Sequence, residues 1–228
     1  MRTLTLLLCF ALASLTLSAQ TTFGVRAAYG TSNVRSGPAL DVATDRLDAL
    51  GATSFGAFAE IPLTPVVSLR PGLEFTQRGT QLRLTQDVAV AGVPLPLGAR
   101  AATRLSYLEA PLLFQFNLPT TAAVRPYAIA GPSLGYATGG RVTTAARALI
   151  ELDLFSQDID LDAIDYQRAH VALVGGLGAR ARLGGVVDLF VEARYEHGLS
   201  QPYDVPLVSD KLGFRNWNVG AGVTFALP

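Results

Sequence analysis

The feature that most constrains this chain is a two-residue alternation that puts oily side chains on one face and charges of both signs on the other. In the phrase SLRPGLEFTQR, residues 68–78, Leu73 and Phe75 share one face. Arg70 and Glu74 share the opposite face. The same split recurs in YLEAPLLFQF and in VVDLFVEARYEHG. Because successive side chains of a β-strand point to opposite sides, the pattern predicts strands with one apolar and one charged face.

Eight segments after the first twenty residues show this alternation. They cover residues 22–30, 51–61, 66–78, 103–117, 124–137, 168–183, 186–198 and 214–227. The connections alternate in length, since PLTP, LPTTAA and GG are short, whereas long loops are expected over 31–50, 79–102, 138–167 and 199–213. The predicted fold is all-β, an eight-stranded antiparallel up-and-down transmembrane β-barrel with its apolar face toward lipid. The alternation leaves open a soluble sheet whose charged face is solvated.

The predicted inner face carries balanced charge. Its charged residues are Arg26, Glu60, Arg70, Glu74, Arg78, Glu109, Arg180, Arg182, Asp188, Glu192, Arg194 and Glu196. An eight-stranded barrel has an interior just wide enough for its own side chains, so paired guanidinium and carboxylate groups would fill it. The sequence therefore predicts a plugged lumen. The whole chain has a formal net charge of zero, which argues against a nucleic-acid partner.

The first nineteen residues have the features of an export signal. Arg2 precedes an apolar run, and the small residues Ser18 and Ala19 suit cleavage after Ala19. We expect a signal peptide over residues 1–19 and one outer-membrane β-barrel domain over 20–228. A short membrane anchor is the alternative. The only cysteine, Cys9, lies inside the signal, so the mature chain would have no thiol, which fits an oxidising compartment.

The last segment, NWNVGAGVTFALP, carries two further signals. Trp217 and Phe225 share its apolar face, about 26 Å apart along a strand and roughly 20 Å apart along the membrane normal after tilting. We expect one aromatic side chain near each membrane boundary. Asn218, Gly220, Val223 and Phe225 also resemble the C-terminal signal that the barrel-assembly machinery reads. The three residues after Phe225 depart from that pattern, in which the chain often stops at the aromatic residue.

One group of residues has the composition of a hydrolase triad. Ser200, His197 and Asp204 lie close together in the sequence, but no nucleophile-elbow motif accompanies them. The favoured interpretation is that His170 and His197 lie exposed at the rim of the barrel.

The phrase ELDLFSQDIDLDAIDYQR is rich in aspartate. Its aspartates are Asp153, Asp158, Asp160, Asp162 and Asp165. Alternate aspartates supply the oxygen ligands that calcium prefers, but Ala163 and Ala169 replace the glycine and glutamate of an EF-hand, which excludes that motif. Loose calcium binding and a solvated acidic loop both stay open.

Several phrases, taken in order, resemble the PorT-like outer-membrane β-barrel family. They are FGVRAAYG, GAFAEIPL, LRPGLEFTQRG, LSYLEAPLLFQFNL, RPYAIAGPSLGY, GGLGARARL and LFVEARYEHGL. The resemblance covers nearly all of the mature chain and implies an eight-stranded outer-membrane barrel. It implies little chemistry, since most relatives lack an assigned activity. One branch is associated with a secretion system that exports proteins across the outer membrane.

Three functional hypotheses follow. The first is a non-enzymatic barrel of the cell outer membrane, without cofactor or metal, that serves structure or binds an envelope protein through its surface loops. The second is a gated channel or an accessory of protein secretion. The third is a hydrolase at the rim. The expected partners are outer-membrane lipid and, during insertion, the barrel-assembly machinery.

Overall fold

The computed structural model describes residues 21–35, 47–90, 93–147, 151–159, 167–200 and 213–226. These residues form nine antiparallel strands. They are β1 (Thr22–Arg35), β2 (Leu47–Pro62), β3 (Val67–Val90), β4 (Val93–Asn117), β5 (Val124–Arg147), β6 (Glu151–Ile159), β7 (Ala169–Gly184), β8 (Val187–Gly198) and β9 (Gly213–Ala226). The predicted signal peptide, residues 1–19, lies outside the described residues.

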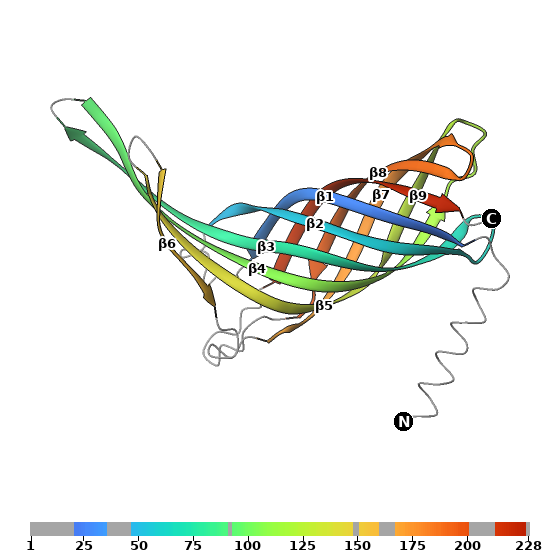
Figure 1. The fold of residues 1–228 in the computed structure, drawn as a ribbon, viewed down its shortest axis with the longest axis horizontal. Coiled ribbons are helices and arrows are strands. Elements are labelled where there is room, and N and C mark those ends of the chain that lie inside the picture. The colour runs from blue at the N-terminus through green and yellow to red at the C-terminus, as the bar shows by residue number, and fades with distance from the viewer. Residues whose placement is uncertain are drawn as a thin grey trace, which may run out of the picture.

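Eight of these strands close into a barrel (Figure 1). The sheet runs in the order β4-β3-β2-β1-β9-β8-β7-β5-β6, and an additional pairing of β4 with β5 joins its two ends. β5 pairs with β7 up to Tyr136 and with β6 from Gly140 onward, so β6 extends the sheet beyond the closed wall. The predicted eight-stranded antiparallel barrel is therefore confirmed.

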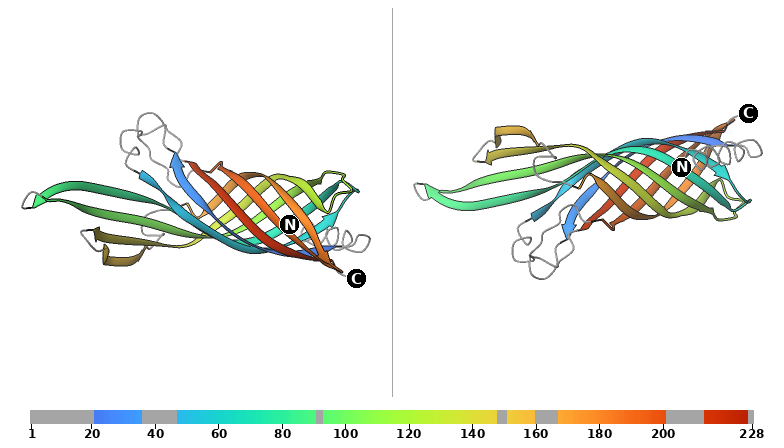
Figure 2. Two further views of the ribbon diagram at one scale, coloured as in Figure 1. Left: turned by 90° about the horizontal axis from the view of Figure 1, so that it is seen from above. Right: turned by 90° about the horizontal axis from the view of Figure 1, so that it is seen from below.

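The short connections gather at one end of the barrel, where β1 begins and β9 ends (Figure 2). They are residues 63–66, 118–123 and 185–186. In the last of them, Gly184 and Gly185 have φ angles of +145° and +54°, which side-chain-bearing residues rarely adopt. An outer-membrane barrel has its short turns on the periplasmic side, so the opposite end faces outward.

The long connections differ from the prediction. β3 and β4 stay paired until Val90 meets Val93, so the loop predicted over 79–102 is a hairpin that projects from the barrel. Likewise β5 continues to Arg147 and pairs with β6 inside the loop predicted over 138–167. Outside the membrane both faces of a strand meet water, so the period-2 pattern that reveals a strand is lost while the backbone hydrogen bonds persist.

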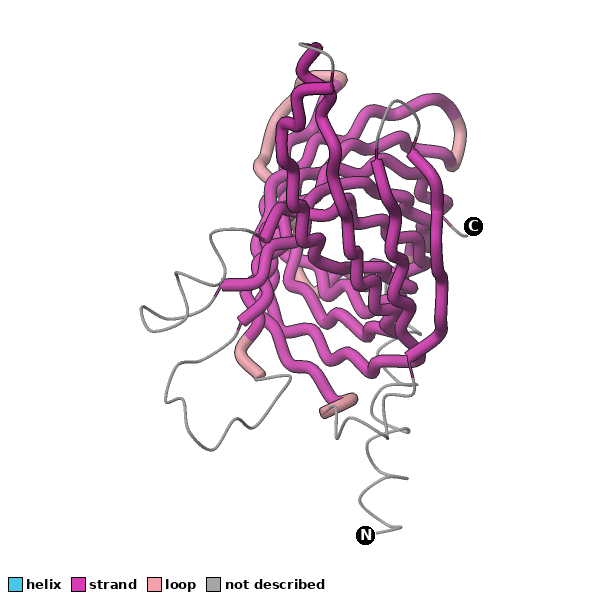
Figure 3. The backbone as a smooth tube through the Cα atoms, turned by 90° about the vertical axis from the view of Figure 1, so that its left-hand side faces the viewer, coloured by secondary structure: helices cyan, strands magenta, loops and turns pink. Residues whose placement is uncertain are grey.

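The oily face of the wall is the outside of the barrel. Large apolar side chains exposed on it include Phe23, Val25, Leu73, Phe114, Leu173, Leu177, Val191 and Val219. The alternate positions of the same strands point into a closed interior, around which the wall runs in the end-on view of Figure 3. A soluble sheet would bury its apolar face, so this arrangement fits a barrel that meets lipid.

Candidate functional site

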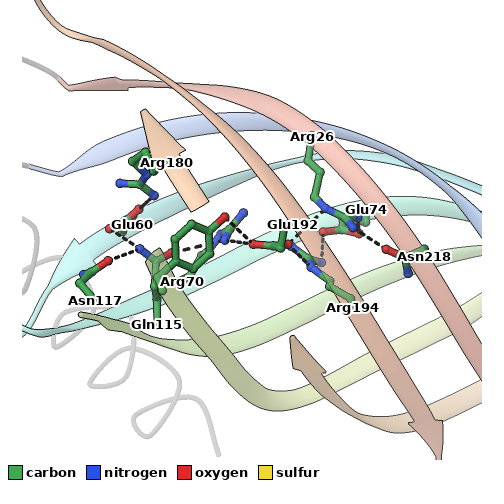
Figure 4. Close-up of polar contacts among 11 residues, drawn as sticks. Arg26, Glu60, Arg70, Glu74, Gln115, Asn117, Arg180, Glu192, Arg194 and Asn218 are labelled. Carbon is green, nitrogen blue, oxygen red and sulfur yellow. Dashed lines mark hydrogen bonds and ion pairs between the residues drawn. The ribbon is translucent and has the colours of Figure 1, made fainter. Parts of the chain in front are cut away.

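The interior of the barrel contains a network of buried ion pairs, and Glu192 of β8 lies at its centre (Figure 4). Its carboxylate accepts hydrogen bonds from Arg70 Nη1 at 2.6 Å and from the Tyr127 hydroxyl at 3.0 Å. Arg194 Nε also donates to it, and Arg26 Nε lies 3.2 Å away. One buried carboxylate thus joins side chains from β1, β3, β5 and β8.

Glu74 of β3 is the second acceptor of this central cluster. Arg194 Nη1 donates to its carboxylate at 2.7 Å, and Arg26 Nη1 lies 3.7 Å from it. Arg26 Nη2 also donates to the side-chain oxygen of Asn218 on β9. The two guanidinium groups therefore bridge both glutamates, which is possible because each guanidinium carries several N–H donors.

A chain of polar contacts continues toward the end with the short turns. Gln115 accepts from Arg70 Nη1 at 3.3 Å and donates to Glu60 Oε1 at 3.0 Å. Glu60 in turn accepts from Arg180 Nη2. Gln115 also donates to Asn117 at 2.8 Å. Figure 4 shows these side chains following one another inside the barrel, with Arg180 and Glu60 at one end of the row.

A second cluster closes the lumen toward the outer end. Arg78 of β3 donates to both carboxylate oxygens of Glu196, at 2.6 and 2.8 Å, and also to Glu109. His170 Nε2 lies 3.4 Å from Glu196 Oε1. The predicted rim exposure of His170 is therefore wrong, because its ring is buried and packs 5.9 Å from the ring of Tyr107.

The buried charges of the described residues balance. The buried arginines are Arg26, Arg70, Arg78, Arg180 and Arg194, and the buried acids are Glu60, Glu74, Glu109, Glu192 and Glu196, five of each. A buried charge is costly unless it is paired and hydrogen-bonded. Each of the ten groups belongs to at least one ion pair, so every buried charge of this set has an opposite charge beside it.

Apolar side chains also fill the lumen, which was not predicted from the sequence. The buried cluster consists of Phe58, Leu113, Tyr127, Ile129, Val174 and Phe190. The guanidinium carbon of Arg70 lies 3.6 Å from the ring centre of Phe58 and 5.3 Å from that of Phe190. The position of these residues in their strands could have predicted that they face inward. Phe58 lies two residues before Glu60 on β2, and Phe190 lies two residues before Glu192 on β8, so each shares the inward face of its neighbour.

Two of the residues predicted for the interior lie at its edge. Arg182 has a side chain that is 67% exposed, and Asp188 accepts from Arg125 Nη2 at 2.6 Å. A register shift between Arg182 and Gly184 precedes the turn into β8, so the wall ends here and these side chains reach water. The structure places the other ten predicted residues inside the barrel.

The C-terminal strand presents the predicted faces. Trp217 and Phe225 are exposed on the outside, near opposite ends of β9, and Trp217 lies 4.8 Å from the ring of Tyr195. Gly220 faces inward, where an added Cβ would lie 2.8 Å from the guanidinium carbon of Arg26. Val223 lies on the outward parity of the strand. The reading of Asn218, Gly220, Val223 and Phe225 by assembly machinery stays a prediction.

The structure does not assemble the triad considered from the sequence. His197 is exposed on the outer face, and Asp204 lies outside the described residues. Ser200 Oγ instead lies 2.9 Å from His170 Nδ1 and accepts from the Val171 backbone N–H at 3.0 Å. The serine hydroxyl therefore joins the ends of β7 and β8.

The aspartate-rich phrase gives no metal centre among the residues that the structure describes. Asp153 lies in β6, and Asp158 accepts a hydrogen bond from Arg141 Nε at 2.8 Å. Asp160, Asp162 and Asp165 lie outside the described residues, so calcium binding stays untested. In the described ranges, no group of three or more histidine, cysteine or acidic residues is placed to hold a metal ion.

A closed antiparallel barrel with an oily outside and an ion-paired inside defines a small transmembrane β-barrel protein. A family model described as the outer membrane protein beta-barrel domain matches residues 14–203. The chain belongs to this family, and its location is the cell outer membrane. Among the residues described, no helix is long and apolar enough to cross a membrane.

Solved structures of outer-membrane proteins are similar to the chain. Neisserial surface protein A (NspA) is 16% identical, with 90% of this chain and 97% of that chain covered and a TM-score of 0.42. Ail, the attachment invasion locus protein of Yersinia pestis, is 13% identical, with coverages of 90% and 99% and a TM-score of 0.39. OprG from Pseudomonas aeruginosa is 14% identical, with coverages of 92% and 97% and a TM-score of 0.41. A comparison with curated proteins gave no match.

Proposed function

We propose that this protein is a non-conducting, non-enzymatic outer-membrane barrel that presents its projecting β3–β4 hairpin to an envelope protein. The observation that carries the proposal is the length of the hairpin. Pairing is continuous from Phe75 and Leu108, on the lipid-facing wall, to Val90 and Val93 at the tip. Fifteen residues of strand span about 50 Å, whereas a strand tilted by about 40° crosses the roughly 25 Å apolar band in about 33 Å, so the hairpin extends well beyond the band.

The outer part of this hairpin has open edges in the described part of the chain. β2 pairs with β3 only as far as Leu82, and β5 pairs with β4 only from Gly98. Unpaired strand edges are templates for an added strand, which supplies main-chain hydrogen bonds to a partner. Pro94 and Pro96 lack the N–H that an added strand needs, so the β4 edge is blunted. The proposed docking edge is therefore residues 83–90 of β3.

The hydrogen bonds of Ser200 support the proposal that the protein is not a hydrolase. Its hydroxyl already accepts from a backbone N–H and contacts His170, and the carboxylate beyond that histidine is held by Arg78. We also propose membership of the PorT-like family, which rests on the phrases quoted above. Export with cleavage after Ala19 belongs to the same proposal.

Site-specific photo-crosslinking in the outer membrane tests the docking edge. A photoreactive residue at Thr85 should form an adduct with one defined envelope protein, because it lies on the open edge. The matched control places the same residue at Leu95, between Pro94 and Pro96 on the blunted edge, and should give no adduct. No adduct from Thr85, or equal adducts from both positions, would refute strand addition at this edge.

Shortening the hairpin provides an independent check. Leu82 and Ala101 are paired, so replacing residues 83–100 by Asn-Gly creates a two-residue connection of the favoured kind. This variant should keep the barrel and lose the crosslinked partner. Planar-bilayer recordings of the intact protein should show no steady conductance, and a steady open pore would overturn the filled lumen.

A further inference from the structure

A pocket of about 640 Å³ lies where the sheet leaves the barrel wall at its outer end. Its polar lining comes from Gln77, Arg104, Ser106, Arg141, Thr143 and Asp158, on β3, β4, β5 and β6. It is separate from the lumen, because β4 alternates between exposed Arg104 and buried Leu105 and Tyr107.

The height of this pocket matches a lipid headgroup. Leu108 and Tyr136 are register partners, and both are exposed on the lipid-facing wall. Arg104 lies four residues farther out on β4, about 13 Å along the strand and roughly 10 Å along the membrane normal. The pocket therefore lies just beyond the apolar band and continues its surface.

The pocket holds two arginines in a position that is unfavourable for like charges. Arg104 and Arg141 are direct register partners on adjacent antiparallel strands, and both are exposed. Like charges that lie opposite each other on a sheet repel. Asp158 pairs with Arg141 Nε at 2.8 Å, and no acid of the described residues pairs with Arg104. The lining therefore carries two positive charges and one negative charge.

The pocket is also kept open by its backbone. A register shift between Ser106 and Tyr107 marks a bulge beneath it, and such bulges redirect side chains. Gly139 lines the pocket, and a Cβ added there would meet no atom within 4 Å. The neutral donors are also in place, since Gln77 Nε2 donates to Ser106 Oγ at 3.4 Å.

We propose that this pocket binds the phosphate group of an outer-leaflet lipid. Arg104 and Arg141 hold the phosphate oxygens between their guanidinium groups, which suits the bidentate geometry of arginine and removes the repulsion between them. Gln77, Ser106 and Thr143 supply hydrogen bonds to the rest of the headgroup. The acyl chains lie along Leu108 and Tyr136 below, which is why the ligand is a lipid and not free phosphate.

Native mass spectrometry of the purified barrel with phosphatidic acid tests the proposal. The wild type should retain this lipid about tenfold more strongly than a double variant with Arg104→Gln and Arg141→Gln, the effect of losing one or more charge-assisted hydrogen bonds. Arg215→Gln, at the same end on β9, is the matched control and should retain lipid as the wild type does. Equal retention by the double variant and the wild type would overturn the site.

Three further measurements separate the pocket from general charge attraction. Gly139→Leu fills the hollow without altering a charge and should weaken lipid retention as the arginine substitutions do. Phosphatidic acid should raise the thermal midpoint of the wild type and leave that of the double variant unchanged, because a ligand stabilises the state that binds it. Inorganic phosphate at millimolar concentration should not displace the lipid, and displacement would show that free phosphate is the ligand. Unchanged retention by Gly139→Leu would also contradict the proposal. None of these outcomes depends on a protein partner at the hairpin.

Discussion

Replacing Glu192 by glutamine is the most direct test of the ion-paired lumen. The substitution keeps the size of the side chain and removes one negative charge from a fully buried position. Arg26 and Arg194 would then share the carboxylate of Glu74, and Arg70 would lose its ion pair with Glu192. Removing one partner of a buried ion pair typically costs about 3–5 kcal/mol of unfolding free energy, because the charges left behind lose their compensation.

The charge-balanced double variant separates this electrostatic cost from simple loss of contacts. Adding Arg70→Met to Glu192→Gln removes one charge of each sign. If uncompensated charge is the cause, the double variant should be more stable than Glu192→Gln alone by about 1–3 kcal/mol. Val191→Leu, the outward-facing neighbour on β8, is the control and should shift stability by no more than about 0.5 kcal/mol.

Urea unfolding in phospholipid vesicles measures these differences. Trp217 is the only tryptophan of the chain and is 61% exposed on the outer wall, so its fluorescence reports the transfer from lipid to water. A loss below about 1 kcal/mol for Glu192→Gln would refute the reasoning, since it falls outside the range for a buried pair. Additive losses in the double variant would equally contradict it.

Three smaller changes test other parts of the wall. Gly222→Ala should destabilise the barrel by about 1–3 kcal/mol in the same assay, because the new Cβ would clash with the backbone carbonyl oxygen of Val25 and would lie 2.5 Å from a ring carbon of Phe190. Arg182→Ala should change stability by no more than about 0.5 kcal/mol, since its side chain is mostly in water. Ser200→Ala should lower the free energy of unfolding by about 1 kcal/mol, because it removes the hydroxyl that contacts His170 and Val171. The background rate of ester hydrolysis should not change, and a loss of that activity would favour the hydrolase hypothesis.

The alternation of positions along each strand correctly predicted which side chains of the barrel wall face inward and which face outward. Because the wall separates lipid from a closed interior, Arg70 and Glu74 had to share a side opposite Leu73 and Phe75. Phe58 has the same parity as Glu60 on β2, but the prediction of the inner face included charged residues alone. The apolar part of the lumen was therefore predictable and was missed.

The partners of each charge could not be predicted from the alternation. Arg70 on β3 donates to Glu192 on β8, across the barrel and 122 residues later in the chain. Which charges meet depends on the stagger of the strands on closure, and the two-residue period contains no information about stagger. The projecting hairpin was not predicted for a different reason. Its strands have water on both sides and need no apolar face, so they show no two-residue alternation.

The distribution of charge shows that the lumen acts as one unit. The central cluster has three arginines, Arg26, Arg70 and Arg194, against Glu74 and Glu192, whereas the outer cluster has Arg78 against Glu109 and Glu196. The surplus positive charge of one cluster offsets the surplus negative charge of the other. Their members come from strands that meet only when the barrel closes, so neutrality is reached at closure. An ion moving through the lumen would have to break these buried pairs in succession, and each break exposes an uncompensated charge. The folded barrel is therefore expected to stay closed to ions.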